Sequence, residues 1–332
     1  MSTAAVGFCI VGMGMGLARG RELLKTAGAK LVSVVDIDAE RANKAASELG
    51  CKAHTSTREA FKDPSVDFVL VMTPSGLHAP IAIEALEAGK HVISTKPMEV
   101  SLEKCDAMIA AAKKAGKMLG VDFQERYTPA TQQIKYAIDN GLLGKPILAE
   151  ARLKWFRSQE YYDKGGWRGT WKMDGGGSLA NQSVHLIDLL TWIMGRPSRV
   201  IGRTYTLNHR IETEDLGMAM LEYPNGAVGS ILGTTTVPKG DWWGLEIHGS
   251  KGAVVAFLGK EYQWRFLDGL DDRKEKLKTL FPHRNIFEDA VSALRNGTPL
   301  ACPAGEGRRS VELLTTIYAS SRDGGKAITL NA

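Results

Sequence analysis

Three closely spaced glycines stand near the start of the chain, in Gly12-Met13-Gly14-Met15-Gly16, directly after a short apolar run. Glycine lets a backbone approach a pyrophosphate closely, and the N-terminus of a following helix stabilises the negative charge. The usual third glycine of such a motif would be residue 17, which is leucine here. Because the spacing is irregular, the turn alone fits a structural role as well as a dinucleotide site.

Asp36 ends the second apolar run, about twenty residues after the glycine turn, where an acidic side chain accepts hydrogen bonds from the ribose of a dinucleotide. Asp38 is better placed to cap the next helix, which weakens a purely structural interpretation of Asp36. A carboxylate at this place also repels the extra phosphate of NADP, and the next helix carries a single arginine, Arg41. The sequence therefore favours NAD over NADP.

These residues need elements that position them, and strands alternate with helices through the first third of the chain. The predicted strands cover residues 6–11, 31–35, 68–72, 91–94 and 117–121, and the main predicted helices cover residues 17–27, 39–49, 80–88 and 102–115. This alternation predicts right-handed crossovers and a parallel sheet covered on both faces. Ligands bind such a Rossmann domain at the carboxyl ends of its strands. We assign residues 1–121 to this domain.

The pattern changes after residue 121, where several strands follow one another without intervening helices. Predicted strands cover residues 147–156, 200–205, 217–223, 227–233, 245–248 and 253–258, and predicted helices cover residues 129–140, 178–194, 285–295 and 306–320. Pro224-Asn225-Gly226 is a hairpin signal between two of the strands. Residues 122–332 are therefore predicted to form a second domain of the α+β class, with a largely antiparallel open sheet.

The composition excludes several classes of protein. The net charge of +5 comes from 42 basic and 37 acidic residues without a basic block, so a nucleic-acid partner is not expected. Four widely spaced cysteines indicate a reducing compartment, and we expect a cytoplasmic protein. No run of eighteen apolar residues is present, so no membrane span is expected, and the histidines lack metal-ligand spacing.

Two further segments complete a family pattern. Thr73-Pro74-Ser75-Gly76-Leu77-His78 follows the strand at 68–72, and Ala88-Gly89-Lys90-His91-Val92 leads to Thr95-Lys96-Pro97. Together with the glycine turn, they resemble the family of glucose–fructose oxidoreductase and inositol dehydrogenase (Gfo/Idh/MocA) from about residue 6 to residue 330. The family usually has glutamate where this chain has Thr95.

The resemblance implies roles for individual residues. Thr73 and Pro74 would line the cofactor, Lys96 would be the catalytic lysine that anchors the substrate, and Lys96–Pro97 would be a cis peptide. The predicted NAD-binding residues are Gly12, Met13, Gly14, Met15, Gly16, Asp36, Ile37, Arg41, Thr73, Pro74, His78, Thr95, Lys96 and Pro97.

The second domain carries Trp167-Arg168-Gly169-Thr170-Trp171, then Asp174-Gly175-Gly176-Gly177, then Asn181-Gln182-Ser183-Val184-His185. Many family members have an aspartate four residues before this histidine, where this chain has Asn181. The three stretches resemble the branch of UDP-N-acetylglucosaminuronate 3-dehydrogenases. The predicted substrate-binding residues are Lys96, Arg157, Trp167, Arg168, Asn181 and His185, with Tyr161 and Tyr162 as further sugar contacts.

Lys96 and His185 are the predicted catalytic residues. Oxidation of a secondary alcohol needs a base that titrates near neutral pH, which histidine supplies, and a cation that stabilises a developing alkoxide, which lysine supplies. The i, i+4 spacing of a helix would place Asn181 and His185 on one face. Asp188, one turn further, fits an orienting role for His185 and an ordinary helix carboxylate equally well.

The function predicted from these residues is hydride transfer between NAD(H) and a secondary alcohol or ketone of a sugar, polyol or nucleotide sugar. Two alternatives remain: a glycosidase that uses NAD for transient oxidation, and a non-catalytic dinucleotide sensor. A sensor would need neither Lys96 nor His185. The family resemblance also implies a homodimer or homotetramer that pairs the exposed faces of its C-terminal sheets.

Overall fold

The structure, a computed structural model, describes residues 4–257, 259, 262–267, 277 and 279–330. It contains two compact units. The first comprises Met1–Gln124 and Arg284–Arg308, and the second comprises Glu125–His283 and Arg309–Ala332. The chain first passes from one unit to the other after Gln124, close to the boundary expected after residue 121. The assignment of residues 284–308 differs from the prediction. These residues cluster with the N-terminal unit and not with the rest of the C-terminal domain.

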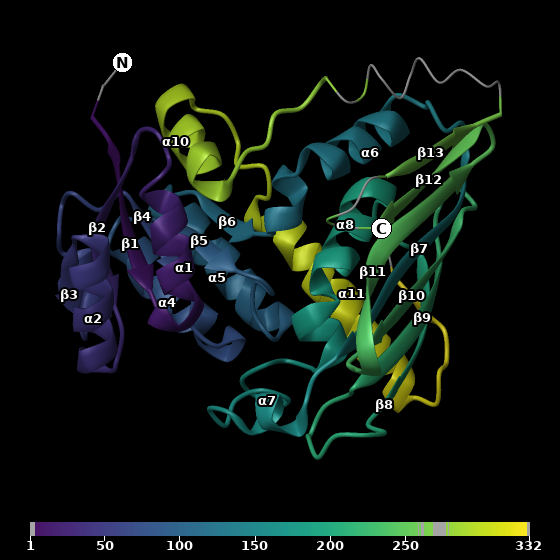
Figure 1. Ribbon diagram of the computed structural model, residues 1–332, viewed down its shortest axis with the longest axis horizontal. Helices are drawn as coiled ribbons and strands as arrows, with labels where there is room; N and C mark the ends of the chain where they lie inside the picture. Colours follow the sequence, from purple (N-terminus) through teal and green to yellow (C-terminus); the bar gives the residue numbers. More distant parts are fainter. Residues whose placement is uncertain (1–3, 258, 260–261, 268–276, 278, 331–332) are drawn as a thin grey trace. The chain divides into compact units, whose positions relative to one another are not determined.

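A six-stranded parallel sheet of order β3-β2-β1-β4-β5-β6 forms the centre of the first unit (Figure 1). Its strands are β1 (Val6–Val11), β2 (Ala29–Val35), β3 (Lys52–His54), β4 (Phe68–Val71), β5 (His91–Thr95) and β6 (Leu119–Asp122). All residues of β1 and β4 are buried, as expected of strands covered on both faces. The order reverses between β1 and β4, and the carboxyl ends of these strands are where a Rossmann sheet binds its ligand. The predicted parallel sheet is confirmed.

The helices of the first unit are α1 (Met13–Leu23), α2 (Ala39–Leu49), α3 (Thr57–Phe61), α4 (His78–Glu87), α5 (Leu102–Ala115) and α10 (Ile286–Asn296). Packing explains why α10 belongs here. Phe287 of α10 meets Phe8 of β1 edge to face, with ring centres 5.4 Å apart, and Phe8 stacks on Phe68 of β4 at 5.5 Å. A segment far along the chain thus completes the core of the N-terminal unit.

An eight-stranded sheet of order β13-β12-β11-β7-β10-β9-β8-β14 forms the second unit. Its strands are β7 (Pro146–Phe156), β8 (Arg199–Tyr205), β9 (Leu216–Glu222), β10 (Val228–Thr234), β11 (Thr236–Gly249), β12 (Gly252–Phe257), β13 (Gln263–Phe266) and β14 (Ile328–Thr329). Neighbouring strands are antiparallel except for β7 and β10, so the predicted largely antiparallel sheet is confirmed. The last residue of the strand predicted at 253–258 lies outside the described residues.

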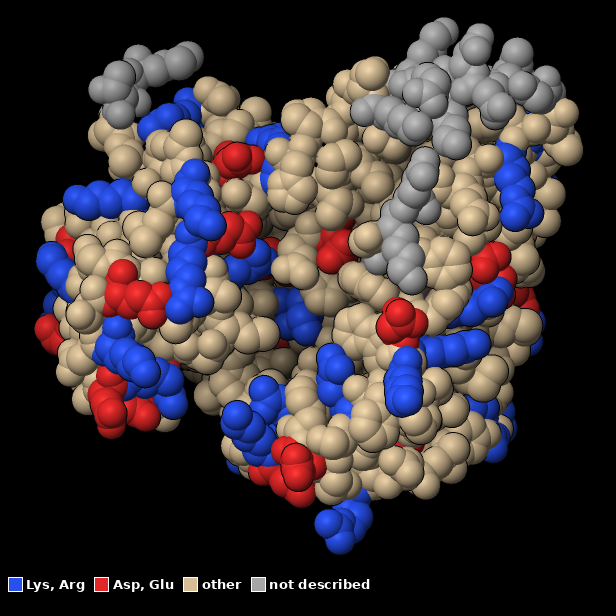
Figure 2. Space-filling view, viewed as in Figure 1, with Lys and Arg blue, Asp and Glu red and all other residues tan. Residues whose placement is uncertain are grey.

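Helices cover one face of this sheet (Figure 1). They are α6 (Pro129–Asp139), α8 (Val184–Met194) and α11 (Ala304–Arg322), and a short helix, α7 (Gln159–Asp163), follows β7. Burial alternates along β9, where one set of side chains packs inward and the other, including Met218 and Met220, is exposed. None of the helices described here has both the length and the hydropathy needed to cross a bilayer. Basic and acidic side chains are interspersed over the face drawn in Figure 2.

Candidate functional site

The glycine turn joins β1 to α1 and depends on close approaches that only glycine permits. Gly12 has a φ of 95°, and a Cβ there would lie 2.8 Å from the carbonyl oxygen of Met72. A Cβ on Gly16 would lie 2.9 Å from Met13 Cε and 3.0 Å from Ile10 Cγ2. Gly16 therefore allows α1 to pack closely on β1, which is the role of the third glycine in the usual motif.

Helix α1 begins at Met13, four residues earlier than the sequence predicted, so Gly14, Met15 and Gly16 lie in its first turn. A Cβ on Gly14 would meet no described atom within 4 Å, which leaves open space at this end of the helix. Its N-cap, Gly12, offers no side-chain cap to the backbone N–H groups. These donors and the helix dipole suit a pyrophosphate.

Asp36 follows β2 and is tied to both neighbouring loops. Its Oδ2 accepts from the backbone N–H of Met13 at 2.8 Å, and its Oδ1 accepts from that of Asp38 at 3.0 Å. Arg41 donates from Nε and Nη2 at 2.8 and 2.6 Å. Burial opposes ionisation, but these hydrogen bonds hold the pKa of Asp36 below its usual value. The carboxylate is charged at neutral pH and stands beside the start of α1.

Thr73 and Pro74 follow β4, at the carboxyl edge of the sheet. The Oγ1 of Thr73 is buried and has no hydrogen-bond partner among the described residues, so it suits a ligand hydroxyl. His78 is buried between two loops, with Nε2 2.9 Å from the Thr73 carbonyl oxygen and Nδ1 3.0 Å from that of Pro97. Burial lowers the pKa of His78. The ring braces the two loops against each other.

Lys96 follows β5, and the Lys96–Pro97 peptide is cis, as the resemblance implies. Thr95 pairs in register with Asp122 of β6. Burial raises the pKa of Asp122, and the positive charges of Arg19 and Lys96 oppose that rise. A carboxyl group therefore interacts with Lys96 from the neighbouring strand, although position 95 carries none.

In the second unit, Asn181 and His185 lie in helices of different kinds. Residues Ser178–Gln182 form a π-helical turn, and His185 is the second residue of α8. The continuous helix predicted over residues 178–194 is therefore wrong at its start. The regular i, i+4 spacing from which one shared face was predicted does not hold there.

Glu214 explains the irregular start of this segment. Its carboxylate accepts from the backbone N–H groups of Gly177 at 3.0 Å and Leu179 at 2.8 Å, and from the hydroxyl of Tyr318 at 3.0 Å. The main chain wraps around the carboxylate and departs from α-helical geometry. Burial raises the pKa of Glu214 to about 7, even though the hydrogen bonds from Gly177, Leu179 and Tyr318 each favour the ionised form.

Asp174 holds Asn181. Its Oδ1 accepts from Asn181 Nδ2 at 2.7 Å, and its Oδ2 accepts from the backbone N–H of Gly169 at 2.9 Å. Asp174 is only 1% exposed, so both bonds form away from bulk water, where they are strongest. One buried carboxylate, that of Asp174, therefore joins the loop at Gly169 to the turn that carries Asn181.

Asp188, one turn beyond His185, contacts Arg126. Arg126 donates from Nε and Nη2 to the two carboxylate oxygens at 2.7 and 2.8 Å, and its guanidinium lies 5.1 Å from the ring centre of Trp192. The hydroxyl of Ser310 lies 3.3 Å from Asp188 Oδ1. Of the two interpretations left open by the sequence, these contacts favour the structural one, in which Asp188 anchors α8.

Aromatic rings and guanidinium groups alternate near β7 and α7. The guanidinium of Arg157 lies 5.0 Å from the ring centre of Trp155 and 5.2 Å from that of Tyr161. The guanidinium of Arg168 lies 4.8 Å from the centre of Tyr161 and 4.6 Å from that of Trp167. We call these five residues the arginine–aromatic ladder; it holds Arg157, Trp167 and Arg168 of the predicted substrate set together.

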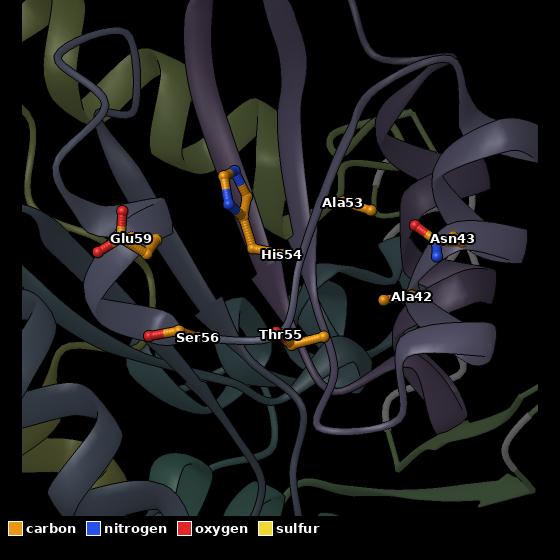
Figure 3. A pocket seen from close by; sticks show the side chains of 7 residues that line it. All are labelled: Ala42, Asn43, Ala53, His54, Thr55, Ser56 and Glu59. Carbon is orange, nitrogen blue, oxygen red and sulfur yellow. The ribbon is translucent and has the colours of Figure 1, made fainter.

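Cavities lie within each of the two units among the described residues. One of about 250 Å³ lies among α2, β3 and α3 of the first unit, and its lining includes His54 and Glu59 but no predicted site residue (Figure 3). The other, of about 420 Å³, lies in the second unit and is lined partly by Arg168 and Arg210. In the part of the chain that the structure describes, no three His, Cys, Asp or Glu side chains are grouped as a metal site requires.

Comparison with known proteins agrees with this geometry. Residues 6–123 match the model of an oxidoreductase family with an NAD-binding Rossmann fold, and residues 131–255 match the GFO/IDH/MocA C-terminal domain. Scyllo-inositol 2-dehydrogenase (NAD(+)) of Bacillus subtilis (strain 168) is 30% identical over 258 residues, or 75% of this chain and 72% of that protein. The chain belongs to the Gfo/Idh/MocA family.

The match to solved members of the Gfo/Idh/MocA family extends over the whole chain. The WlbA dehydrogenase of Bordetella pertussis, solved in complex with NADH and UDP-GlcNAcA, is 33% identical, with a TM-score of 0.92, covering 100% of this chain and 99% of that one. The 1,5-anhydro-D-fructose reductase of Ensifer adhaerens is 30% identical over 70% of this chain and 69% of that protein. The chain is therefore an NAD-binding oxidoreductase of the sugar and polyol type.

The residues predicted to bind NAD all lie in the first unit. They lie at the end of β5, in the loops after β1, β2, β4 and β5, or in the first turns of the helices that follow. Ile37 is 92% exposed and Met15 is 54% exposed, so these two side chains lie at the surface of that unit. Apart from Lys96, the predicted substrate residues all lie in the second unit.

Sequence reasoning missed three residues that hold the others in place. Asp174 was visible only as the start of the Gly-rich stretch, and nothing in the local pattern of Arg126 or Glu214 pointed to a partner. Their partners lie 7, 62 and at least 35 positions away along the chain. Such pairs become evident only in the folded chain.

Proposed function

We propose that this chain oxidises a secondary alcohol of a nucleotide sugar, or reduces the corresponding ketone, with Lys96 and His185 as catalytic residues. The observation that supports it most strongly is the likeness over the full chain to a dehydrogenase solved with NADH and UDP-GlcNAcA. The stretch Asn181-Gln182-Ser183-Val184-His185 and the arginine–aromatic ladder agree with a substrate that carries more than a neutral sugar ring.

The residues of the first unit fit NAD. The open N-terminus of α1 would hold the pyrophosphate, Asp36 would accept the ribose hydroxyls, and Thr73 Oγ1 would bond a further hydroxyl. The carboxylate of Asp36 disfavours the additional phosphate of NADP. When bound, NAD supplies the acceptor for a hydride.

Lys96 and His185 would handle the charge and the proton. In the oxidation direction, the imidazole of His185 would take the proton of the substrate hydroxyl, since its neutral form is a base near pH 7. The ammonium of Lys96 would stabilise the negative charge that grows on the oxygen as the hydride leaves carbon. In the other direction, the same two groups would polarise the ketone and protonate the alkoxide.

A substrate screen tests this proposal. Purified protein is mixed with NAD and, in separate reactions, with inositols, free sugars, UDP-sugars and UDP-linked uronates, and NADH formation is followed at 340 nm. Turnover of UDP-linked sugars alone is expected. Turnover of inositols or free sugars alone would contradict the nucleotide-sugar assignment, and tight NADH binding without turnover of any class would favour a sensor.

We further propose a homodimer formed by the open face of the eight-stranded sheet. Met218, Met220 and Tyr205 are 50%, 47% and 40% exposed, and an apolar sheet face of this kind favours association. Light scattering on the purified protein checks the mass, and M220E should shift it towards the monomer. The four free cysteines agree with a reducing compartment, the cytoplasm.

A further inference from the structure

The two guanidinium groups of the arginine–aromatic ladder share one ring. Those of Arg157 and Arg168 lie 5.2 and 4.8 Å from the ring centre of Tyr161, so both positive charges contact the same ring. Cation–π contacts hold each group against its rings but do not neutralise the charge. Like charges that contact one ring repel each other, and the repulsion rises when water is partly excluded.

Within the described part of the chain, neither arginine of this pair forms an ion pair with a carboxylate. Arg157 donates from Nη1 to the main-chain carbonyl of Phe156 at 3.1 Å, and Arg168 donates from Nη1 to that of Lys164 at 3.0 Å. The Nε of each is buried and has no hydrogen-bond partner among the described residues. The Nε–Nη2 edge is the one with which arginine binds carboxylate or phosphate through two parallel bonds.

The ladder is connected to the turn that carries Asn181. Gln182 donates from Nε2 to the hydroxyl of Tyr161 at 3.0 Å, and Gln182 Oε1 is buried without a partner among the described residues. The two guanidinium contacts and this hydrogen bond fix the position of Tyr161. The guanidinium groups are therefore preorganised and do not have to be ordered when a ligand binds.

The cavity of about 420 Å³ beside Arg168 offers room for a ligand group. Two carboxylates also line it, and both have other partners: Glu212 accepts from the backbone N–H of Trp171 at 3.1 Å, and Asp163 accepts from Gln159 Nε2 at 2.8 Å. Neither carboxylate forms an ion pair with Arg168 among the described residues.

We propose that Arg157 and Arg168 are an anion clamp and that the substrate must carry a diphosphate or a carboxylate, which would accept from the free Nε–Nη2 edges. This inference rests on the proposed function and assigns the residues that would bind the anionic part of its substrate. A neutral polyol such as an inositol would leave both guanidinium groups unbalanced. An anionic sugar derivative removes their repulsion and makes charge-assisted hydrogen bonds.

The test measures binding rather than turnover. Isothermal titration of the NADH-saturated protein with UDP, glucuronate and myo-inositol separates the diphosphate, the carboxylate and a neutral ring. At least one of the two anions should bind, and R157Q and R168Q should each weaken it tenfold or more, as the loss of a charge-assisted hydrogen bond predicts. R322Q is the matched control, because Arg322 lies over a single ring, that of Trp171, outside the ladder; it should bind the anion like the wild type.

R157K and R168K form a second pair of variants in case the glutamine variants unfold. Lysine keeps the positive charge but lacks the two-pronged edge, so weaker anion binding at unchanged NADH affinity is expected. The clamp is overturned if both anions bind equally well to wild type and all four variants, or if only myo-inositol binds. The proposed function then still stands if a UDP-linked sugar is oxidised. Arginine-dependent binding of UDP without turnover of any sugar would leave the clamp standing and overturn the proposed function.

Discussion

The side-chain amide of Asn181 donates from Nδ2 to Oδ1 of Asp174 across 2.7 Å. Because an ionised carboxylate only accepts hydrogen bonds, the group that faces Asp174 must be the NH₂. The carbonyl oxygen of Asn181 is therefore the end that points away from Asp174. Many members of the family carry aspartate at position 181. In this chain the carboxylate belongs to Asp174, the hydrogen-bond partner of residue 181. It sets the orientation of the neutral amide of Asn181.

The hydrogen bond between residues 174 and 181 needs one amide donor and one carboxylate acceptor, and we predict that the two groups can be exchanged between these positions. N181D places two carboxylates together, and we expect kcat to fall about tenfold to a hundredfold because a charge-assisted hydrogen bond is replaced by repulsion. The double variant D174N/N181D restores one donor and one acceptor and should recover much of the loss. Steady-state kinetics on the substrate found in the screen gives both values. A double variant no better than N181D would contradict the coupling; D323N, an exposed aspartate in the same unit, is the control.

Removal of the imidazole at position 185 should affect the chemical step alone. We expect H185A to lower kcat by about 10²- to 10⁴-fold, the usual contribution of a general base. NADH affinity, measured by fluorescence titration, should stay within about twofold, since the residues that fit the cofactor lie in the first unit. H283A, at an exposed histidine, should behave as wild type. Unchanged turnover in H185A would remove His185 from the mechanism.

Loss of the ammonium at position 96 should affect binding and rate together. K96A is expected to raise KM and to lower kcat by about a hundredfold or more, as the loss of a charge that stabilises the transition state predicts. K96R keeps the charge but not the geometry, and it should regain substrate binding more than rate. K62A, at an exposed lysine of the same unit, is the control. A wild-type rate in K96A would rule out the assignment.

The preference for NAD should depend on Asp36. This carboxylate now holds Arg41 by two bonds, at 2.6 and 2.8 Å. In D36S the guanidinium is released and the charge that repels the 2′-phosphate is gone. NADH affinity should therefore fall about tenfold while NADPH affinity rises, because a hydrogen-bond acceptor is lost and a cation is freed. Titration of both dinucleotides measures the ratio; equal affinity of the wild type for the two would overturn the assigned preference.

Glu214 should make stability depend on pH in an unusual direction. Burial raises the pKa of Glu214 to about 7 in the folded chain, above its ordinary value of 4.5. The folded state therefore binds the proton more tightly. Its contribution to stability is complete below about pH 4.5 and is lost as the pH rises through about 7.

Comparison with E214Q isolates this contribution. Between pH 5 and 7 the free energy of unfolding of the wild type should decline relative to that of E214Q, by at most about 1.4 kcal/mol per pH unit. Urea denaturation at several pH values gives the difference. E48Q, at a carboxylate exposed on the other unit, is the control. Parallel curves for wild type and E214Q would show that Glu214 does not titrate in this range.

The sequence by itself determined the features that depend on local spacing. Apolar runs separated by helical segments were enough for the parallel sheet, because each buried strand of such a sheet is apolar along its whole length. Glycine at 12 and aspartate at 36 stood out because one turn and one strand end need those residue types. The strand β3 escaped detection, since Lys52–His54 is three residues long and contains no apolar run.

Only the tertiary structure decided the contacts between residues that are distant in sequence. Phe287 joins the N-terminal core because its ring fits against Phe8, which no local pattern records. The π-helical turn before His185 begins where Glu214, at least 35 positions later, accepts from the backbone N–H groups of Gly177 and Leu179. Spacing along a chain predicts periodic structure, whereas a buried charge finds its partner through packing, and packing is a property of the folded chain.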